Sequence, residues 1–358
     1  MGMLVKALPI FLCAKACFCE KCTNFVPLMK VLYITNIEVP YRTTFFNQLA
    51  QRVELTVLYE RRVAQHRDAG WTASVKRNYV CEYLDGVDSG NESGFSLSII
   101  GWVKRGWDRI IIGCYNTKSK LLAMAYMRLR RIPFSINLDG EPYIATGLKS
   151  AVKRWVLRGA ASYFVPGDMA ALSVAKVVGN KPISVYHFSS LTRDEVERNA
   201  SLTCEREDFV LVVGQYLDAK GLDVAVEVAR SMPHVPFRFV GTGVRSTQFV
   251  RDCAPIPANV ELIAFLPKDA LMEQYRKCRA LVLPSRQECW GLVVNEAASL
   301  GTPIVSTTGS GAAVEFLADS PFAHYLARPG DADSLQQCLA RCLATPQADY
   351  SLYLKEKS

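Results

Sequence analysis

The sequence contains no run of about 18 apolar residues, so it lacks the pattern of a membrane-spanning helix. The short apolar run after Lys6 is soon interrupted by Lys15, which makes it a poor signal peptide. Charged residues form only 21% of the 358 residues and hydrophobic residues 50%, which argues against long disordered segments. Because internal repeats and low-complexity segments are also missing, the sequence indicates a globular chain with the length of two ordinary domains.

Paired C-x2-C spacings, the usual mark of a zinc site, are nearly absent although the chain has twelve cysteines. Eight are scattered from Cys81 to Cys342, which is typical of small buried hydrophobes in a reducing compartment, so we expect a cytoplasmic protein. The other four crowd together, at Cys13, Cys17, Cys19 and Cys22. Zinc there is the less favoured interpretation, and no metal is expected.

Acidic residues are scarce in the first 200 residues, where 27 Lys and Arg stand against 16 Asp and Glu, a net charge of +11. Residues 201–358 hold 15 Lys and Arg and 18 Asp and Glu, a net charge of −3. A basic half indicates an anionic partner. Nucleic acid is not expected, because the half lacks a recognised motif and interleaved aromatic residues.

Two segments of the basic half, 120–131 and 148–159, read as basic amphipathic helices. Their cationic residues are Arg128, Arg130, Arg131, Lys149, Lys153, Arg154 and Arg158. Such faces bind anionic membranes, although an ordinary solvated helix face is the alternative. We expect peripheral contact with an anionic membrane, at its inner face.

Short apolar strands alternate with helical segments along the whole chain, which predicts parallel sheets covered on both faces. Strands are expected at 30–35, 54–59, 108–113, 133–138, 162–166 and 182–188, and again at 209–214, 236–241, 259–265, 279–284 and 303–307. A polar stretch, 189–208, separates the two series. The fold class is therefore α/β, with two doubly wound Rossmann-like domains whose ligands bind in the central cleft at the carboxyl ends of the strands.

The expected divisions of the chain follow from these patterns. They are an N-terminal extension (1–28), a first domain (29–195), a second domain (196–345) and a short C-terminal tail (346–358). In the first domain, a helix is expected over 43–53. One of two interpretations of residues 36–42 is a simple turn before this helix, with Thr43 or Thr44 as its N-cap; the other is given below.

The most informative segment is LVLPSRQECWGLVVNEAASLGTPIV, residues 281–305. A buried strand ends at Pro284, a polar loop follows, and a helix begins near Gly291 and ends at Gly301. The backbone N–H groups at such a helix start suit phosphate or sugar oxygens. Glu288 in the loop and Glu296 in the helix frame this start, and carboxylates accept paired hydrogen bonds from vicinal diols.

This segment resembles the Glu-x7-Glu signature of retaining GT-B glycosyltransferases, especially those of family 4. The matching positions beyond the two glutamates are Pro284, Ser285, Gly291, Ala297, Gly301 and Pro303. LVVGQYLDAKGLD resembles the first strand and loop of the donor domain, and FRFVGTG resembles its Val-Gly-x-Gly turn. The resemblance covers roughly 208–343 and implies the GT-B fold.

The resemblance also implies roles for single residues. Glu288 would hold the donor sugar as the catalytic carboxylate, Glu296 the ribose of the nucleotide, and Lys220 the diphosphate. The donor site would be completed by Gly214, Gln215, Gly241 and the backbone around Trp290, Gly291 and Leu292. No cofactor or metal is implied, because a cation and a helix start can stabilise the leaving phosphate.

The chain departs from the family pattern in two places. The family has an arginine where this chain has Gln215, and glutamine lacks the charged fork of arginine. Arg245 or Arg286 are the candidate replacements. The resembling enzymes also continue in a longer helix that crosses back onto the first domain, where residues 346–358 are expected to form only a short tail.

The first domain is expected to bind the acceptor. NIEVPYRTTFFNQLA resembles the first loop and helix of family members that act on surface polysaccharides, so Asn36, Pro40, Tyr41 and Arg42 are candidates to line the cleft. Asp139 and Glu141 follow a strand end, where ligand groups belong, and Asp139 is the first choice for a catalytic carboxylate in this domain. The alternative for Asp139 is a simple Asp-Gly turn. Of the four histidines, only His187 follows a strand of this domain, and none is expected to be catalytic.

The predicted function is transfer of a sugar from a nucleotide-diphosphate sugar to a saccharide or lipid-linked saccharide, with retention, in glycan biosynthesis. Sugar-nucleotide epimerisation is the second enzymatic hypothesis. The main alternative, from another class, is a non-catalytic glycosyltransferase-like subunit that binds a partner enzyme; Gln215 and the short tail favour it, whereas Glu288, Glu296 and Lys220 oppose it.

Overall fold

A computed structural model describes residues 28–62, 76–85, 95–140, 148–186, 188–202 and 205–345 of the chain. The chain forms two compact units, which divide between Phe188 and Ser189. The boundary expected at residue 195 falls inside helix α7 (Arg193–Ser201), which belongs to the second unit. The cysteines at 13–22, Glu141, His187 and the tail 346–358 lie outside the described residues.

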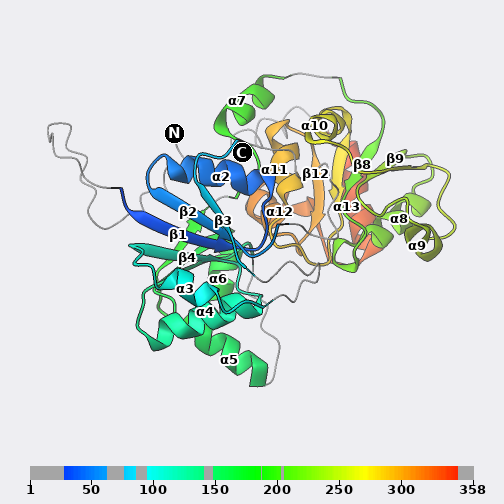
Figure 1. Cartoon of the computed structure of the whole chain (residues 1–358). Helices are drawn as coiled ribbons and strands as arrows, with labels where there is room; N and C mark the ends of the chain where they lie inside the picture. Colours follow the sequence, from blue (N-terminus) through cyan, green and yellow to red (C-terminus); the bar gives the residue numbers. More distant parts are fainter. Residues whose placement is uncertain are drawn as a thin grey trace. The chain divides into compact units, whose positions relative to one another are not determined.

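The first unit is built on a parallel sheet of seven strands in the order β3-β2-β1-β4-β5-β6-β7. Strands β1 to β4 are labelled in Figure 1. Its strands are β1 (Lys30–Thr35), β2 (Glu54–Tyr59), β3 (Val80–Tyr83), β4 (Arg109–Gly113), β5 (Ser135–Asn137), β6 (Ser162–Pro166) and β7 (Ile183–Tyr186). Its helices are α2 (Pro40–Ala50), α3 (Ile99–Val103), α4 (Lys118–Leu129), α5 (Leu148–Leu157) and α6 (Gly167–Val178). The order reverses between β1 and β4, as in a Rossmann fold.

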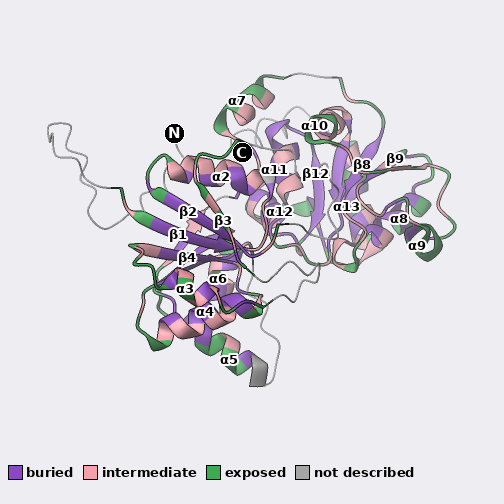
Figure 2. Ribbon diagram, in the orientation of Figure 1, coloured by how far each residue is buried: buried purple, intermediate pink, exposed green. Residues whose placement is uncertain are grey.

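Both faces of this sheet are buried. Alternate residues of β1 enter different cores, because successive side chains of a strand point to opposite faces. Leu32 and Ile34 belong to one hydrophobic cluster, and Val31 and Tyr33 to another. In Figure 2 the strands are correspondingly buried while the outer helix faces are exposed. The predicted double covering of a parallel sheet is confirmed for this unit.

The second unit repeats the plan with six parallel strands in the order β10-β9-β8-β11-β12-β13. The strands are β8 (Val210–Val213), β9 (Phe237–Val240), β10 (Val260–Ile263), β11 (Ala280–Leu283), β12 (Ile304–Thr307) and β13 (Leu326–Ala327). Besides α7, the helical segments are η2 (Asp218–Lys220), α8 (Leu222–Ser231), α9 (Thr247–Asp252), α10 (Lys268–Lys277), α11 (Leu292–Ser299), α12 (Gly311–Leu317), η3 (Ala323–Tyr325) and α13 (Ala332–Ala344). The α/β fold class predicted from the sequence is confirmed.

One helix begins earlier than the sequence predicted. Helix α2 starts at Pro40, with Val39 as its N-cap, and not at Thr43. Proline suits this first position because its missing N–H would be unpaired there anyway. The prediction of Thr43 or Thr44 as the cap was therefore wrong: Thr43 lies inside the helix, where its hydroxyl donates to the carbonyl of Val39 at 3.3 Å. Among the described residues, no helix is both long and apolar enough to cross a membrane.

Candidate donor site at the carboxyl edge of the second sheet

Lys220 and Glu288 meet at the carboxyl edge of the second sheet. Lys220 ends η2, after β8, whereas Glu288 lies in the loop after β11, the strand next to β8. The Lys220 Nζ forms an ion pair with Glu288 Oε2, and both side chains are partly exposed, at 25% and 14%. Strand order therefore brings together two residues that are 68 positions apart in the sequence.

Backbone packing fixes this pair. Gly221 has a φ of +62°, and a Cβ built there would lie 2.2 Å from the carbonyl oxygen of Pro284. Only glycine allows η2 to approach the end of β11 so closely. The N–H of Gln287 also donates to the carbonyl of Ala219 at 3.0 Å. The lysine segment and the glutamate loop are consequently held together by backbone contacts.

The Glu288 carboxylate still has a free oxygen. Its Oε2 faces Lys220 and accepts a long hydrogen bond of 3.5 Å from Ser285 Oγ. In the part of the chain that the structure describes, Oε1 has no hydrogen-bond donor. Since a carboxylate oxygen can accept two hydrogen bonds, this group can still bind hydroxyls.

Helix α11 begins beside the pair, directly after Gly291. Gly291 has a φ of +103°, and a Cβ there would lie 2.8 Å from Ser310 Oγ, so the tight entry into the helix requires glycine. The first N–H groups of the helix, at Leu292 and Val293, lack acceptors within it. Trp290 is different: its indole is buried and donates to Asn295 Oδ1 at 2.9 Å, so only its backbone can contribute to a ligand site.

Glu296 lies on α11, one turn beyond this helix start, and both of its oxygens are held. Ser190 Oγ donates to Oε1 at 2.7 Å, and the hydroxyl of Tyr275 on α10 donates to Oε2 at 3.0 Å. Burial raises the pKa of Glu296 above its ordinary value. Sequence reasoning missed Ser190 and Tyr275, because no local pattern marks a residue whose partner is distant in the sequence.

The turn after β9 packs on the loop after β8. A Cβ on Gly241 would lie 2.0 Å from the carbonyl oxygen of Gly214, and the N–H of Tyr216 donates to the carbonyl of Thr242 at 2.9 Å. Gln215 stands between Gly214 and Tyr216, partly exposed. The two glycines are thus needed for packing, and they place Gln215 at the same edge as Lys220.

Arg286 and Arg245, the two candidates to replace the arginine that this chain lacks at position 215, differ in their surroundings. Arg286 is engaged, because both of its Nη atoms bond the carboxylate of Asp223, and this hydrogen bonding lowers the pKa of Asp223. Arg245, in the turn after β9, is exposed and has no hydrogen bond or ion pair among the described residues. Of these two arginines, Arg245 is therefore the one whose guanidinium is not engaged by another described residue.

At the carboxyl edge of the first sheet, the buried Arg42 and the partly exposed Asp139 form a polar cluster. Arg42 is only 4% exposed and forms an ion pair with Asp139. Asp139 also accepts from the Cys114 thiol at 2.8 Å, and Arg42 Nη1 donates to the Tyr33 hydroxyl at 3.2 Å. Burial and the charge of Asp139 raise the pKa of Cys114 to about 12, so the thiol stays protonated. Nearby, the ring of Tyr41 packs edge-on against Phe188 at 5.5 Å.

A second buried ion pair lies at this edge and was not expected from the sequence. Lys120 is fully buried on α4, and its Nζ lies 3.4 Å from Glu60 Oε2 and 3.0 Å from the carbonyl of Gly113. Its Nζ also bonds Asn36 Oδ1. Asn36, expected to line the cleft, is thus tied to this pair. A lysine among apolar helix residues was the only signal in the sequence.

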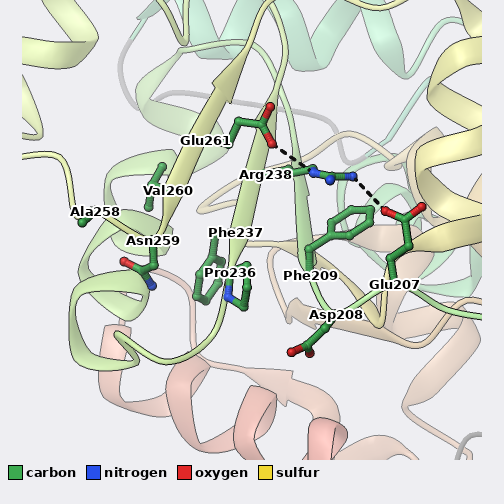
Figure 3. Close-up of a pocket in the computed structure, with 10 residues that line it drawn as sticks. All are labelled: Glu207, Asp208, Phe209, Pro236, Phe237, Arg238, Ala258, Asn259, Val260 and Glu261. Carbon is green, nitrogen blue, oxygen red and sulfur yellow. Dashed lines mark hydrogen bonds and ion pairs between the residues drawn. The ribbon is translucent and has the colours of Figure 1, made fainter.

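A cavity of about 410 Å³ lies elsewhere, at the amino ends of β8, β9 and β10. Figure 3 shows Arg238 at this cavity between Glu207 and Glu261, and its guanidinium lies 3.9 Å from the centre of the Phe209 ring. Ligands of such sheets bind at the carboxyl ends of strands. We therefore assign the site to the opposite edge, where the polar groups described above converge.

Helices α4, α5 and α6 carry basic and exposed apolar side chains. The guanidinium of Arg128 stacks on the Trp155 ring at 4.5 Å, and Arg158 Nε donates to the carbonyl of Val177 at 2.8 Å, which joins the three helices. Exposed apolar residues of this α4–α6 surface are Leu129, Val152, Trp155, Met169 and Leu172. Neither α4 nor α5 contains an acidic residue, whereas α6 carries the exposed Asp168 in its first turn.

The second unit is similar in sequence to known glycosyltransferases. Residues 193–357 match the family described as Glycosyl transferases group 1. A D-inositol 3-phosphate glycosyltransferase of Mycobacteroides abscessus is 30% identical over 112 residues, which are 29% of this chain and 25% of the relative. The lipopolysaccharide glucosyltransferase WaaG of Escherichia coli is 25% identical over 153 residues, 42% of this chain and 41% of the relative. The chain thus matches less than half the length of these relatives.

Solved structures extend the likeness to both units. A trehalose-6-phosphate synthase has a TM-score of 0.67 at 12% identity, covering 91% of this chain and 94% of its own. The structure of WaaG gives a TM-score of 0.60 at 14% identity, with coverages of 91% and 94%. At such identities the likeness concerns the fold alone. The chain therefore has the GT-B fold of these glycosyltransferases, and residues 193–357 match the group 1 glycosyl transferases.

Proposed function

We propose that this protein is a glycosyltransferase that moves a sugar from a nucleotide-diphosphate sugar to a saccharide acceptor, with retention of anomeric configuration. The observation that carries the proposal is the pairing of Lys220 with Glu288 beside the start of α11. This combination offers a cation, helix N–H groups and a carboxylate at one strand edge. The family match and the glycosyltransferase relatives support the same reaction class.

The chemistry follows from the charges that develop during transfer. When the bond between sugar and diphosphate breaks, negative charge grows on the leaving phosphate, and Lys220 together with the N–H groups of Leu292 and Val293 would stabilise it. The free oxygen of Glu288 would bind hydroxyls of the donor sugar. Neither glutamate is proposed as a covalent nucleophile. Retention is instead assigned to front-face attack by the acceptor, with the leaving phosphate taking its proton.

The first unit is proposed to bind the acceptor through the edge that holds Asp139. Its carboxylate is 27% exposed while its partner Arg42 is buried, so Asp139 is fixed in place yet still reachable by a hydroxyl. The acceptor is proposed as a saccharide, free or lipid-linked, in glycan biosynthesis. Tyr41 and Pro40, at the start of α2, are proposed as further contacts.

The α4–α6 surface supports peripheral contact with an anionic membrane. The basic side chains of α4 and α5, two helices without an acidic residue, favour anionic headgroups, and the exposed apolar side chains can enter the headgroup region. Sedimentation with vesicles tests this: the chain should pellet with phosphatidylglycerol vesicles and not with phosphatidylcholine alone. A double charge reversal, Lys153→Glu with Arg154→Glu, should abolish pelleting; equal pelleting of the variant would refute the assignment.

The main test is binding and turnover with a panel of nucleotide sugars. The cognate donor should raise the melting temperature in a concentration-dependent way and yield product with a saccharide acceptor. Glu288→Ala should retain the fold and lose transfer. Substantial turnover by this variant would remove Glu288 from the mechanism.

A non-catalytic subunit is the alternative, favoured by the observation that glutamine replaces arginine at position 215. On that hypothesis, no nucleotide sugar or nucleoside diphosphate would shift the melting temperature. A shift together with product formation would exclude it.

A further inference from the structure

Glu296 is held from two sides by residues that no sequence motif assigns. Ser190 Oγ donates to one oxygen at 2.7 Å and Tyr275 to the other at 3.0 Å. A glutamate on a helix surface ordinarily samples several rotamers, and fixing it costs conformational entropy. Two donors on different elements remove this freedom before any ligand arrives.

Tyr275 is a rigid donor. Its side chain is fully buried on α10, and its carbonyl accepts from Thr302 Oγ1 at 2.7 Å. Arg206 binds the carbonyls of Cys278, at 2.9 Å, and of Gly301, at 2.8 Å, which staples the end of α10 to the segment after α11. Burial, together with the charge of Glu296, keeps the pKa of Tyr275 well above its ordinary value, so the hydroxyl stays protonated.

Ser190 is also fixed, although it lies in a connecting segment. The next residue, Leu191, is 5% exposed, and a capping box at Thr192 and Glu195 starts α7. Two further bonds join this segment to the helices around Glu296: Lys268 Nζ to Glu195 Oε1 at 2.7 Å, and Asn199 Nδ2 to Ser299 Oγ at 2.8 Å. The position of Ser190 is thus set by packing on α10 and α11.

Ser190 and Tyr275 occupy only half of the hydrogen-bond acceptor positions of the Glu296 carboxylate. A carboxylate has about four acceptor positions, and Ser190 and Tyr275 use one on each oxygen. The unused positions, one on each oxygen, match the two adjacent hydroxyls of a cis diol. A preset carboxylate binds such a diol with less loss of entropy than a mobile one.

We propose that Ser190 and Tyr275 are positioning residues that set Glu296 to bind both ribose hydroxyls of the donor nucleotide, which makes the site specific for ribonucleotides. This inference rests on the proposed function, and it adds the residues that determine discrimination between ribose and 2′-deoxyribose. Ser190 and Tyr275 act only through Glu296.

The experiment compares a ribonucleoside diphosphate with its 2′-deoxy analogue by isothermal titration calorimetry on the full chain. UDP, GDP and ADP are screened first, and the tightest is used. The wild type should prefer the ribo form by about tenfold or more, the value of one hydrogen bond to a charged group. Ser190→Ala and Tyr275→Phe should each reduce this preference towards that of Glu296→Ala, mainly by weakening the binding of the ribonucleoside diphosphate.

The controls separate positioning from general loosening. Tyr325→Phe removes the hydroxyl of another buried tyrosine of this unit, and Ser320→Ala removes a hydroxyl that donates to the carbonyl of Leu317. Both should keep the wild-type preference. Folding is checked by melting temperature; if Tyr275→Phe is unstable, Ser190→Ala decides alone.

The outcomes are distinct. An unchanged ribose preference in both variants, or equal weakening of the two ligands, overturns the positioning role while leaving nucleotide binding intact. If no nucleoside diphosphate binds the wild type, the proposed function fails and the inference fails with it. If nucleotides bind and Lys220→Ala weakens them but Glu296→Ala does not, only the assignment of the ribose is overturned.

Discussion

The two sheets follow the same strand order over six strands, but the ion pairs at their carboxyl edges differ in how far they are buried. In the first unit, Lys120 and Arg42 are buried and face the carboxylates of Glu60 and Asp139. In the second unit, Lys220 and Glu288 pair while partly exposed, and Arg245 is exposed without a partner among the described residues. The fully buried Lys120–Glu60 pair of the first edge therefore mainly holds the fold, whereas the partly exposed charges, Lys220 and Glu288 at the second edge and Asp139 at the first, are available to a ligand.

The largest effect on stability is expected at the buried pair of the first unit. Lys120→Ala would leave Glu60 as an unpaired buried charge, which costs about 3–5 kcal/mol. Urea unfolding followed by tryptophan fluorescence measures this well, because four of the five tryptophans lie before residue 189. The control is Lys120→Met combined with Glu60→Gln, which removes both charges and should recover much of the loss. If Lys120→Ala and the wild type unfolded with the same urea midpoint, this account would be contradicted.

The pair of the second unit should respond in the opposite way. Lys220→Ala removes the cation at the diphosphate and should lower kcat by about 100-fold to 1,000-fold, the usual loss when one such stabilising group is removed. Its melting temperature should change little, because partly exposed ion pairs contribute about 1 kcal/mol or less. Product formation and thermal unfolding are measured on the same samples. A large loss of stability with normal turnover would erase the contrast between the two edges.

A gain of function would sharpen the contrast further. Gln215→Arg restores the cation of the family pattern next to Gly214 and should tighten nucleoside diphosphate binding about fivefold to tenfold, since a charge-assisted hydrogen bond replaces a neutral one. Calorimetry with the best-binding nucleoside diphosphate measures it. Arg251→Gln, on exposed helix α9, is a matched surface change and should have no effect. Weaker binding by Gln215→Arg would indicate that Arg245 already fills the position.

Much of the fold was predictable because its strands are continuous and apolar. The ranges expected for β1, β2 and β6 agree with the structure to the residue. Strand β3 was missed because its four residues alternate between exposed and half-buried, and β13 because it has only two residues. Short or edge strands carry too few apolar residues to stand out from loops.

The site was predictable only where a motif marks it. The sequence named Lys220, Glu288 and Glu296, but it did not name Tyr275 or Ser190, or the pairing of Lys120 with Glu60. Their partners are 21, 106 and 60 positions away, and they meet only through helix packing and strand order. Asp139 was named, but its ion pair with Arg42 was not. That pair forms because β1, which precedes Arg42, and β5, which precedes Asp139, are separated in the sheet only by β4. Tertiary pairing of this kind leaves no local signal.

Glu296 departs from this contrast between buried and partly exposed charges, because it is a candidate ligand-binding residue whose carboxylate is buried. Burial raises its pKa, so the folded chain holds its proton more tightly than the unfolded chain, whose value is near 4.5. Stability therefore decreases as pH rises from 4.5 through the raised pKa of the folded state. Glu296→Gln removes this loss, so its melting temperature relative to the wild type should increase between pH 4.5 and pH 7.5. Glu227→Gln, on the exposed side of α8, should show no such trend. A constant difference would mean that ionised Glu296 is fully stabilised by Ser190 and Tyr275, and that this group belongs with the satisfied charges of the first edge.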